Sequence, residues 1–147
     1  MGQTQTTINK VNFEDIKMLK RQQNILLINT LSSSEQNCLI EGTLHIKKEE
    51  NAINQHLTNK RICIIVYGKN TNDIAVIKKH QQLVGLGFSK VYVYQGGLFE
   101  WLCLQDIYGN DEFPTTSEEL DILKYKPISI RHQQNLLENL SIHLIKE

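Results

Sequence analysis

The sequence has no excess of charge of either sign, no long apolar run and no cysteine pairs at metal-ligand spacing. Lys plus Arg and Asp plus Glu number 16 each, so no net field gathers nucleic acid or an anionic membrane. No run approaches the length of a membrane span, and the polar N-terminus lacks the hydrophobic stretch of a secretory signal. We therefore expect a soluble, cytoplasmic protein that does not bind nucleic acid.

The three cysteines, Cys38, Cys63 and Cys103, are an odd number and form no C-x-x-C motif. No histidine pair at zinc-ligand spacing accompanies them, so we expect no metal site and no cofactor. Unpaired thiols fit a reducing compartment. Cys63 and Cys103 lie among apolar residues and are interpreted as buried, whereas Cys38 lies in a loop and is the candidate for a reactive thiol.

The first six residues fit the M-G-x-x-x-[ST] pattern for N-myristoylation of Gly2. A single acyl chain gives only marginal and reversible membrane attachment, and no polybasic patch nearby supplies a second anchor. Membrane association is therefore expected only if Gly2 is acylated.

Apolar runs alternate with amphipathic stretches, a pattern typical of β-α-β units around a parallel sheet. A chain of 147 residues is long enough for one domain with its own core. The first helix has a plausible N-cap in Asn12, with Asp15 three residues later. The patterns predict helices over 11–23, 48–58, 74–86 and 98–104, strands over 24–29, 61–67 and 91–94, and short extended pieces at 38–40 and 44–46.

The composition changes after Tyr108, where a loop over 109–116 begins. Thr116 and Glu119 have the spacing of a capping box for a short helix that ends near Pro127. A last helix over 129–147 would place several leucines on one face. We expect a flexible N-terminus over 1–7, an α/β domain over 8–108, and a C-terminal loop and helical extension over 109–147. The candidates for binding a partner are the aromatic and leucine side chains of this region: Tyr108, Phe113, Leu136, Leu140 and Leu144.

The strongest predicted strand, 61–67, runs directly into a polar loop and a helix N-terminus. In open parallel sheets, ligands bind outside the carboxyl ends of the strands, beside helix N-termini. The loop is therefore the candidate binding site, and Gly68 would leave room for a ligand to approach the backbone. In the alternative interpretation, Thr71, Asn72 and Asp73 only cap the helix. The candidate residues of the loop are Gly68, Lys69, Asn70, Thr71, Asn72 and Asp73.

Five segments together resemble the rhodanese-like family, over roughly residues 8–105. The first is 8–16, which looks like the family's N-terminal strand and helix. The most specific is Gly96-Gly-Leu-Phe-Glu-Trp101, which looks like the family's Gly-Gly-x-x-x-Trp element. The others are the strand 26–31, the turn 38–46, and the strand 64–67 before the loop. The resemblance implies an α/β fold with a mainly parallel five-stranded sheet flanked by helices, here with a C-terminal helical extension.

The departures from the family bear on function. The family's catalytic loop begins with Cys and ends with Arg, because a thiolate attacks the sulfur donor while a cation holds the anion. Here these positions hold Gly68 and Asp73, and the Asp-x-Arg of the preceding strand becomes Asn29 and Leu31. The resemblance thus implies a member that lacks the active-site cysteine.

Related inactive domains occur in regulatory parts of phosphatases and in ciliary or centrosomal proteins. By this analogy we expect a catalytically inactive module that binds or scaffolds another protein, within a larger intracellular, cytoskeletal or ciliary assembly. Two alternatives stay open: a weak sulfurtransferase that uses Cys38, and a small-anion sensor that uses the Gly68–Asp73 loop.

Overall fold

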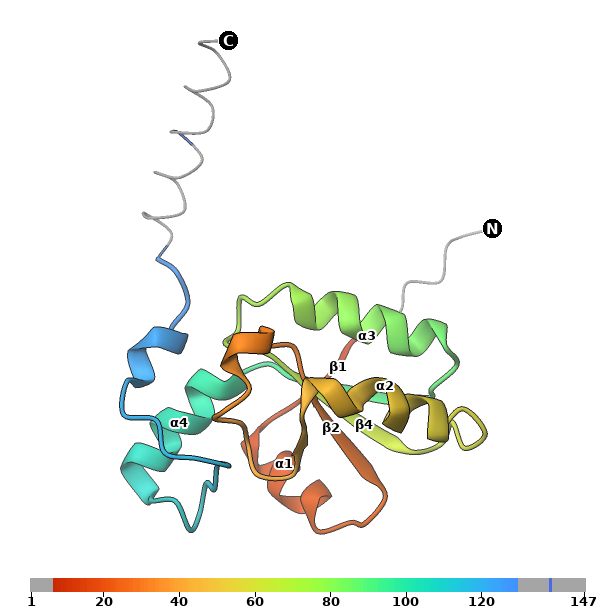
Figure 1. Cartoon of the computed structure of the whole chain (residues 1–147), viewed down its shortest axis with the longest axis horizontal. Coiled ribbons are helices and arrows are strands. Elements are labelled where there is room, and N and C mark those ends of the chain that lie inside the picture. Colours follow the sequence, from red (N-terminus) through yellow and green to blue (C-terminus); the bar gives the residue numbers. More distant parts are fainter. Residues whose placement is uncertain (1–6, 130–137, 139–147) are drawn as a thin grey trace.

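The computed structural model describes residues 7–129 and residue 138. Five strands form one sheet in the order β1-β5-β4-β2-β3, and every neighbouring pair is parallel. The predicted α/β class with a parallel five-stranded sheet is confirmed (Figure 1). The strands are β1 (Asn9–Val11), β2 (Ile25–Asn29), β3 (Thr43–Leu44), β4 (Cys63–Tyr67) and β5 (Lys90–Tyr94).

Four α-helices and two short 3-10 helices surround this sheet. The capping box predicted at the first helix is confirmed, because Asn12 accepts from the backbone of Asp15 and Asp15 accepts from that of Asn12. The helices are α1 (Phe13–Lys20), α2 (Ile46–Gln55), α3 (Ala75–Gly85) and α4 (Gly97–Tyr108), and the 3-10 helices are η1 (Ser33–Glu35) and η2 (Ile122–Tyr125).

The central strand β4 is buried along its whole length because both faces of the sheet are covered. Its residues 63, 65 and 67 belong to the core shared with α1 and α4, where Ile16 and Trp101 are fully buried. Ile64 and Val66 point to the opposite face and belong to the core shared with α2 and α3. The alternation of side chains along one strand therefore joins two cores into a three-layer domain.

The first part of the predicted C-terminal extension packs as part of the same body. Phe113 and Tyr125 are 3% and 2% exposed and lie in the core beneath α4. A backbone bridge pairs Ile40 with Thr115 in antiparallel orientation. The ring of Phe113 contacts the Trp101 ring edge-on, with the ring centroids 5.1 Å apart. Residues 109–128 thus complete the core that residues 8–108 begin.

Some predictions about individual elements are wrong. The Thr116 hydroxyl does not cap a helix: it donates to the Asn37 carbonyl oxygen and accepts from the Leu39 amide. Only the 3-10 turn η2 follows, and it has no side-chain cap. The helix predicted over 48–58 ends at Gln55, so Leu57 lies beyond α2 and is 38% exposed.

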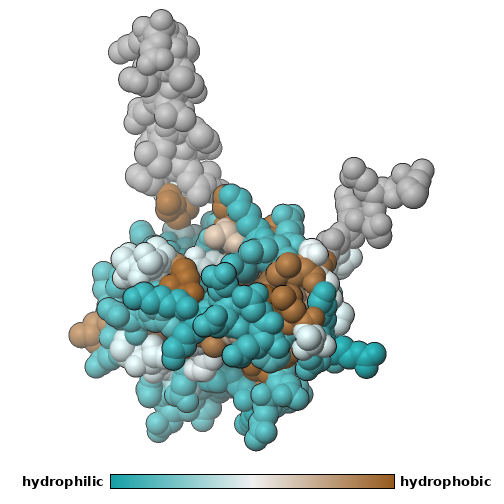
Figure 2. Space-filling model, turned by 45° about the vertical axis from the view of Figure 1, so that its right-hand side comes forward, coloured by the Kyte–Doolittle hydropathy of each residue, from teal (hydrophilic) through white to brown (hydrophobic). Residues whose placement is uncertain are grey.

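The predicted last helix lies outside the described residues except for its start at Ser129 and for residue 138. Leu136, Leu140 and Leu144 are therefore not placed, and neither are residues 1–6 with Gly2. None of the helices between residues 7 and 129 combines the length and apolar composition that a membrane crossing requires. On the face drawn in Figure 2, apolar residues form separate patches among hydrophilic ones.

Candidate functional site

The loop of residues 68–73 leaves the carboxyl end of β4 and leads into α3. Because all strands are parallel, the carboxyl end of the neighbouring strand β2 comes to the same edge, and it places Thr30 beside the loop. The Thr30 amide donates to the carbonyl oxygen of Tyr67 at 3.0 Å, which fixes the two strand ends together. This edge of the sheet is the candidate site.

The carboxylate of Asp73 turns back into the loop and occupies its centre. Oδ2 accepts from the Lys69 amide and from the Thr30 hydroxyl, both at 3.1 Å. Oδ1 accepts from the Ala75 amide at 3.0 Å, at the start of α3. The predicted cap by Thr71, Asn72 or Asp73 is not found, because the N-cap residue of α3 is Ile74, which makes no side-chain cap. Asp73 lies one residue earlier, and its contact with Ala75 holds the loop against the start of the helix. The Asp73 carboxylate thus accepts the hydrogen bonds of the backbone amides that could otherwise bind an anion.

Gly68 has no space for a side chain. A Cβ atom built on it would overlap the Asp73 carboxylate, and it would lie 2.6 Å from Val76 Cγ2 and 2.7 Å from Thr30 Oγ1. Gly68 does not have a positive φ, so it is room and not backbone conformation that requires glycine here. The space in which a side chain at this position would begin is already filled.

The N-terminus of α4 closes the other side of the loop. The Leu98 and Phe99 amides donate to the carbonyl oxygens of Gly68 and Lys69, both at 2.9 Å. Gly97, with φ 68°, permits this approach, since a Cβ there would lie 2.7 Å from the Gly68 carbonyl oxygen. These helix amides therefore bind the loop itself, which explains why α4 begins with a glycine at position 97.

The polar side chains of the loop are largely engaged with their neighbours. The Lys69 ammonium forms an ion pair with Glu35 of η1 at 2.8 Å. Burial opposes the charge on Glu35, but hydrogen bonds from Lys69 and Ser32 outweigh it and lower the pKa of this carboxyl. A small hollow of about 310 Å³ lies at this side of the loop, between Thr30, Glu35 and Lys69.

Asn70 connects the loop to the C-terminal segment. Its Nδ2 donates to the Tyr125 carbonyl oxygen at 2.9 Å, and its Oδ1 accepts from the Asn72 amide at 2.9 Å. Thr71 is exposed and donates only to Asn72 Oδ1, at 3.4 Å. The structure thus brings all six predicted loop residues together, and of these the side chains of Thr71 and Asn72 are the most exposed to solvent.

Asn29, which stands where the family has an acidic residue, forms a buried pair with Gln36. Asn29 Nδ2 donates to Gln36 Oε1 at 3.0 Å, and Gln36 Nε2 donates to Asn29 Oδ1 at 2.8 Å. Gln36 also accepts from the Ile46 amide, which begins α2. The two neutral side-chain amides therefore hydrogen-bond each other at a position where the family has a charged pair.

Sequence reasoning missed both Thr30 and Gln36 as residues of the site. The position of Thr30 directly after a strand could have revealed it.

The native thiols are buried or half-buried and are not activated. Cys38, the candidate reactive thiol, is 3% exposed and donates to the Ser117 carbonyl oxygen at 3.4 Å. Burial raises the pKa of all three thiols, Cys38, Cys63 and Cys103. Cys38 is therefore a packed side chain, contrary to its loop context in the sequence. Across residues 7–129 no three His, Cys, Asp or Glu side chains gather as metal ligands.

The candidate partner residues that the structure describes behave differently from each other. Tyr108, at the end of α4, is 63% exposed, as a surface anchor would be. Phe113 is buried between Phe13, Trp101 and Tyr108, with the Lys17 ammonium 4.2 Å from its ring centroid. The expectation that Phe113 contacts a partner is wrong, because the segment after α4 folds back over the core.

Comparisons with known proteins agree with this architecture. A family model described as "Rhodanese-like domain" matches residues 12–103. Among solved structures, the Alr3790 protein of Anabaena sp. has a TM-score of 0.55 at 21% identity, covering 88% of this chain and 93% of that one. The BH2092 protein of Bacillus halodurans has a TM-score of 0.52 at 17% identity, with 65% and 72% covered.

A thiosulfate sulfurtransferase of Pseudomonas aeruginosa has a TM-score of 0.51 at 17% identity over 65% of this chain and 19% of that one. A search of curated proteins gives no significant match. At these identities the solved structures establish the shared fold but no shared activity. What the site can do chemically has to be inferred from the residues of the loop.

Proposed function

The chain belongs to the rhodanese-like domain family. We propose that, within this family, it does not catalyse sulfur transfer and acts as a protein-binding or scaffolding module. One observation carries the proposal. The position that would hold the nucleophile is Gly68, and the Asp73 carboxylate fills the space that a side chain there would need. Persulfide transfer needs a thiolate at this point, and a carboxylate beside it repels anionic sulfur donors.

The state of the native thiols supports the absence of transfer. A sulfur carrier must be a thiolate within reach of its donor, and burial makes each of the three thiols a weaker acid. Cys38 in particular lies beneath the segment of residues 115–117 and donates to its backbone. The weak sulfurtransferase alternative would require this segment to move away.

The small-anion alternative receives less support than the module. An anion sensor needs amide donors that are not already satisfied, and the Lys69 and Ala75 amides both donate to Asp73. The nearby cation is also neutralised, because Lys69 pairs with Glu35. An incoming anion would have to displace a tethered carboxylate, which is present at a high effective concentration.

The surface formed by residues 107–128 supports binding to another protein. Side chains that are both large and apolar are strongly exposed there, although isolated exposed apolar residues are ordinary on any protein. This region holds half of the exposed large apolar side chains of residues 7–129: Ile107 (70%), Tyr108 (63%), Leu120 (84%), Leu123 (64%) and Ile128 (53%). By analogy with other inactive members, we place the partner in a cytoplasmic, cytoskeletal or ciliary assembly.

A cyanide-dependent thiosulfate assay on the purified full chain tests the loss of transfer. We expect no thiocyanate formation above that of buffer with protein. Single variants Cys38→Ala, Cys63→Ala and Cys103→Ala accompany the wild type. Turnover by the wild type that one of these variants abolishes would overturn the proposal and identify the sulfur carrier.

Affinity purification of the tagged chain from its native cells tests the module. We expect a partner protein in constant stoichiometry across salt concentrations near the physiological range. A parallel preparation without residues 129–147 separates the contribution of Leu136, Leu140 and Leu144 from that of the body. Recovery of the chain alone in both preparations would count against a binding module.

A further inference from the structure

A cleft of about 530 Å³ lies between α4 and the segment of residues 115–122. Its apolar part consists of Leu102, Leu120 and Ile122, and Leu120 is 84% exposed. Its polar part includes Asp106, Glu118 and Glu119, and no Lys, Arg or His lines it. The cleft lies mostly outside the part of the chain that matches the family model, and it is separate from the loop of residues 68–73.

The charge around this cleft is far from the zero net charge of the whole chain. Residues 100–123 contain seven acidic residues and no Lys, Arg or His, so the remaining residues carry 16 basic and nine acidic ones. The seven are Glu100, Asp106, Asp111, Glu112, Glu118, Glu119 and Asp121. Only two of them form ion pairs within the described residues, Glu112 with Lys17 and Glu119 with Lys124.

The uncompensated carboxylates and the exposed apolar side chains occupy the same surface. Asp106 and Glu118 form no ion pair within residues 7–129 and face the cleft from its two sides, one on α4 and one on the segment after it. Leu120 belongs to the lining of the same cleft. A surface of this kind repels acidic partners and stabilises basic ones, and its apolar part provides affinity that charge alone does not.

We propose that this acidic cleft binds a segment of a partner protein in which arginine or lysine side chains flank an apolar side chain. The apolar side chain would pack on Leu120 and Ile122, while the basic ones would lie near Asp106 and Glu118. Such a surface differs from the filled loop of residues 68–73, and it assigns the binding activity to residues that lie mostly beyond the part of the chain that matches the family model. The inference rests on the proposed function as a protein-binding module.

Fluorescence anisotropy with a short synthetic peptide of alternating arginine and leucine tests the proposal on the full chain. We expect saturable binding, with amide NMR shifts confined to residues 102–122. Two further probes separate the contributions: an arginine and serine peptide of equal charge, and a glutamate and leucine peptide of reversed charge. We expect at least about tenfold weaker binding of the first and no binding of the second.

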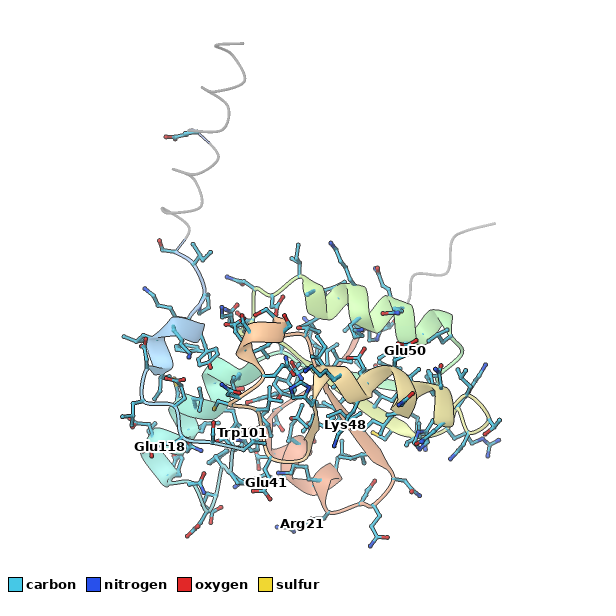
Figure 3. All side chains as sticks on the ribbon, in the orientation of Figure 1. Arg21, Glu41, Lys48, Glu50, Trp101 and Glu118 are labelled. Atoms are coloured by element: carbon cyan, nitrogen blue, oxygen red, sulfur yellow. The ribbon has the colours of Figure 1, made fainter. Side chains whose placement is uncertain are left out.

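The double variant Asp106→Lys with Glu118→Lys should weaken binding of the arginine and leucine peptide by about tenfold or more. The matched control is Glu14→Lys with Glu50→Lys, which changes the net charge equally at two other exposed acids. Figure 3 shows Glu50 on the α2 side of the molecule and Glu118 at the α4 end. An unchanged unfolding midpoint for both double variants shows that they remain folded.

Equal weakening by the two double variants would overturn the proposal, because it would show only an effect of net charge. NMR shifts spread over other surfaces would overturn it as well. Neither result bears on the thiosulfate assay, so a cleft that fails to bind leaves the absence of sulfur transfer standing. Weakening confined to the cleft variant, with shifts at the cleft, supports the assignment.

Discussion

The Asp73 carboxylate lies where the first side-chain atom of residue 68 would have to be, so Gly68 and Asp73 depend on each other. In the sequence these residues are two separate departures from the family pattern, five positions apart. In the structure they are one feature, since the carboxylate accepts from the Lys69 amide and fills the space that glycine leaves. Restoring a side chain at one position requires removal of the carboxylate at the other.

We predict that Gly68→Ala destabilises the protein by about 1–3 kcal/mol, because the new methyl group must displace Asp73, Val76 or Thr30 from well-packed positions. The free energy of unfolding in urea measures this. Gly85→Ala is the matched control, since nothing lies within 4 Å of a Cβ at the end of α3 and alanine should be neutral or slightly stabilising there. Equal effects at the two sites would contradict the account of a filled loop.

We predict that Gly68→Cys combined with Asp73→Gly creates a thiol with a pKa below about 8.5, the ordinary value, because the freed Lys69 and Ala75 amides would then stabilise a thiolate. The pH dependence of alkylation by iodoacetamide, followed at that site by mass spectrometry, measures the shift. The thiol introduced by Gly85→Cys lies in open space and serves as the reference. Identical titration of the two thiols would show that the loop has no thiolate-stabilising geometry.

Burial raises the pKa of Cys38, so the free energy of unfolding should fall as the pH becomes alkaline. A thiol with a raised pKa in the folded state contributes fully below the ordinary thiol pKa, about 8.5, and this contribution is lost as pH rises through the folded value. We predict that Cys38→Ala reduces the fall of unfolding free energy above pH 8.5, by up to about 1.4 kcal/mol per pH unit. Urea unfolding between pH 7 and 10 tests this, and parallel curves for variant and wild type would contradict it.

Phe113 should be essential for stability although it lies beyond the part of the chain that matches the family model. We predict that Phe113→Ala costs about 3–5 kcal/mol, since the ring packs between Phe13 and Trp101 in the core. Tyr108→Ala, five residues earlier and 63% exposed, should cost less than about 1 kcal/mol. A small effect of Phe113→Ala in thermal or urea unfolding would show that the segment after α4 is not part of the core.

Patterns within a few residues predicted the elements well. The continuous apolar run 61–67 identified the buried strand β4, and Asn12 with Asp15 identified the start of α1, because both signals depend only on neighbours along the chain. The same local reasoning failed at Thr116, whose spacing to Glu119 indicated a helix cap. Its hydroxyl contacts Asn37 instead, which lies 79 residues earlier and is invisible to any local pattern.

The sequence by itself determined where the strands β2, β4 and β5 and the helices near them lie, and that Gly68 has no side chain, because hydrophobic periodicity and residue identity are properties of the chain read in order. Periodicity did not identify β1, because a strand of three residues is too short to show a pattern. The tertiary structure alone decided that Asp73 and Thr30 meet in the loop, that Cys38 is buried and that Phe113 belongs to the core. Those outcomes require distant segments to converge, at the carboxyl ends of parallel strands and beneath α4. The hydrophobic periodicity of a segment indicates which of its side chains are buried. It does not indicate which distant side chains pack against them.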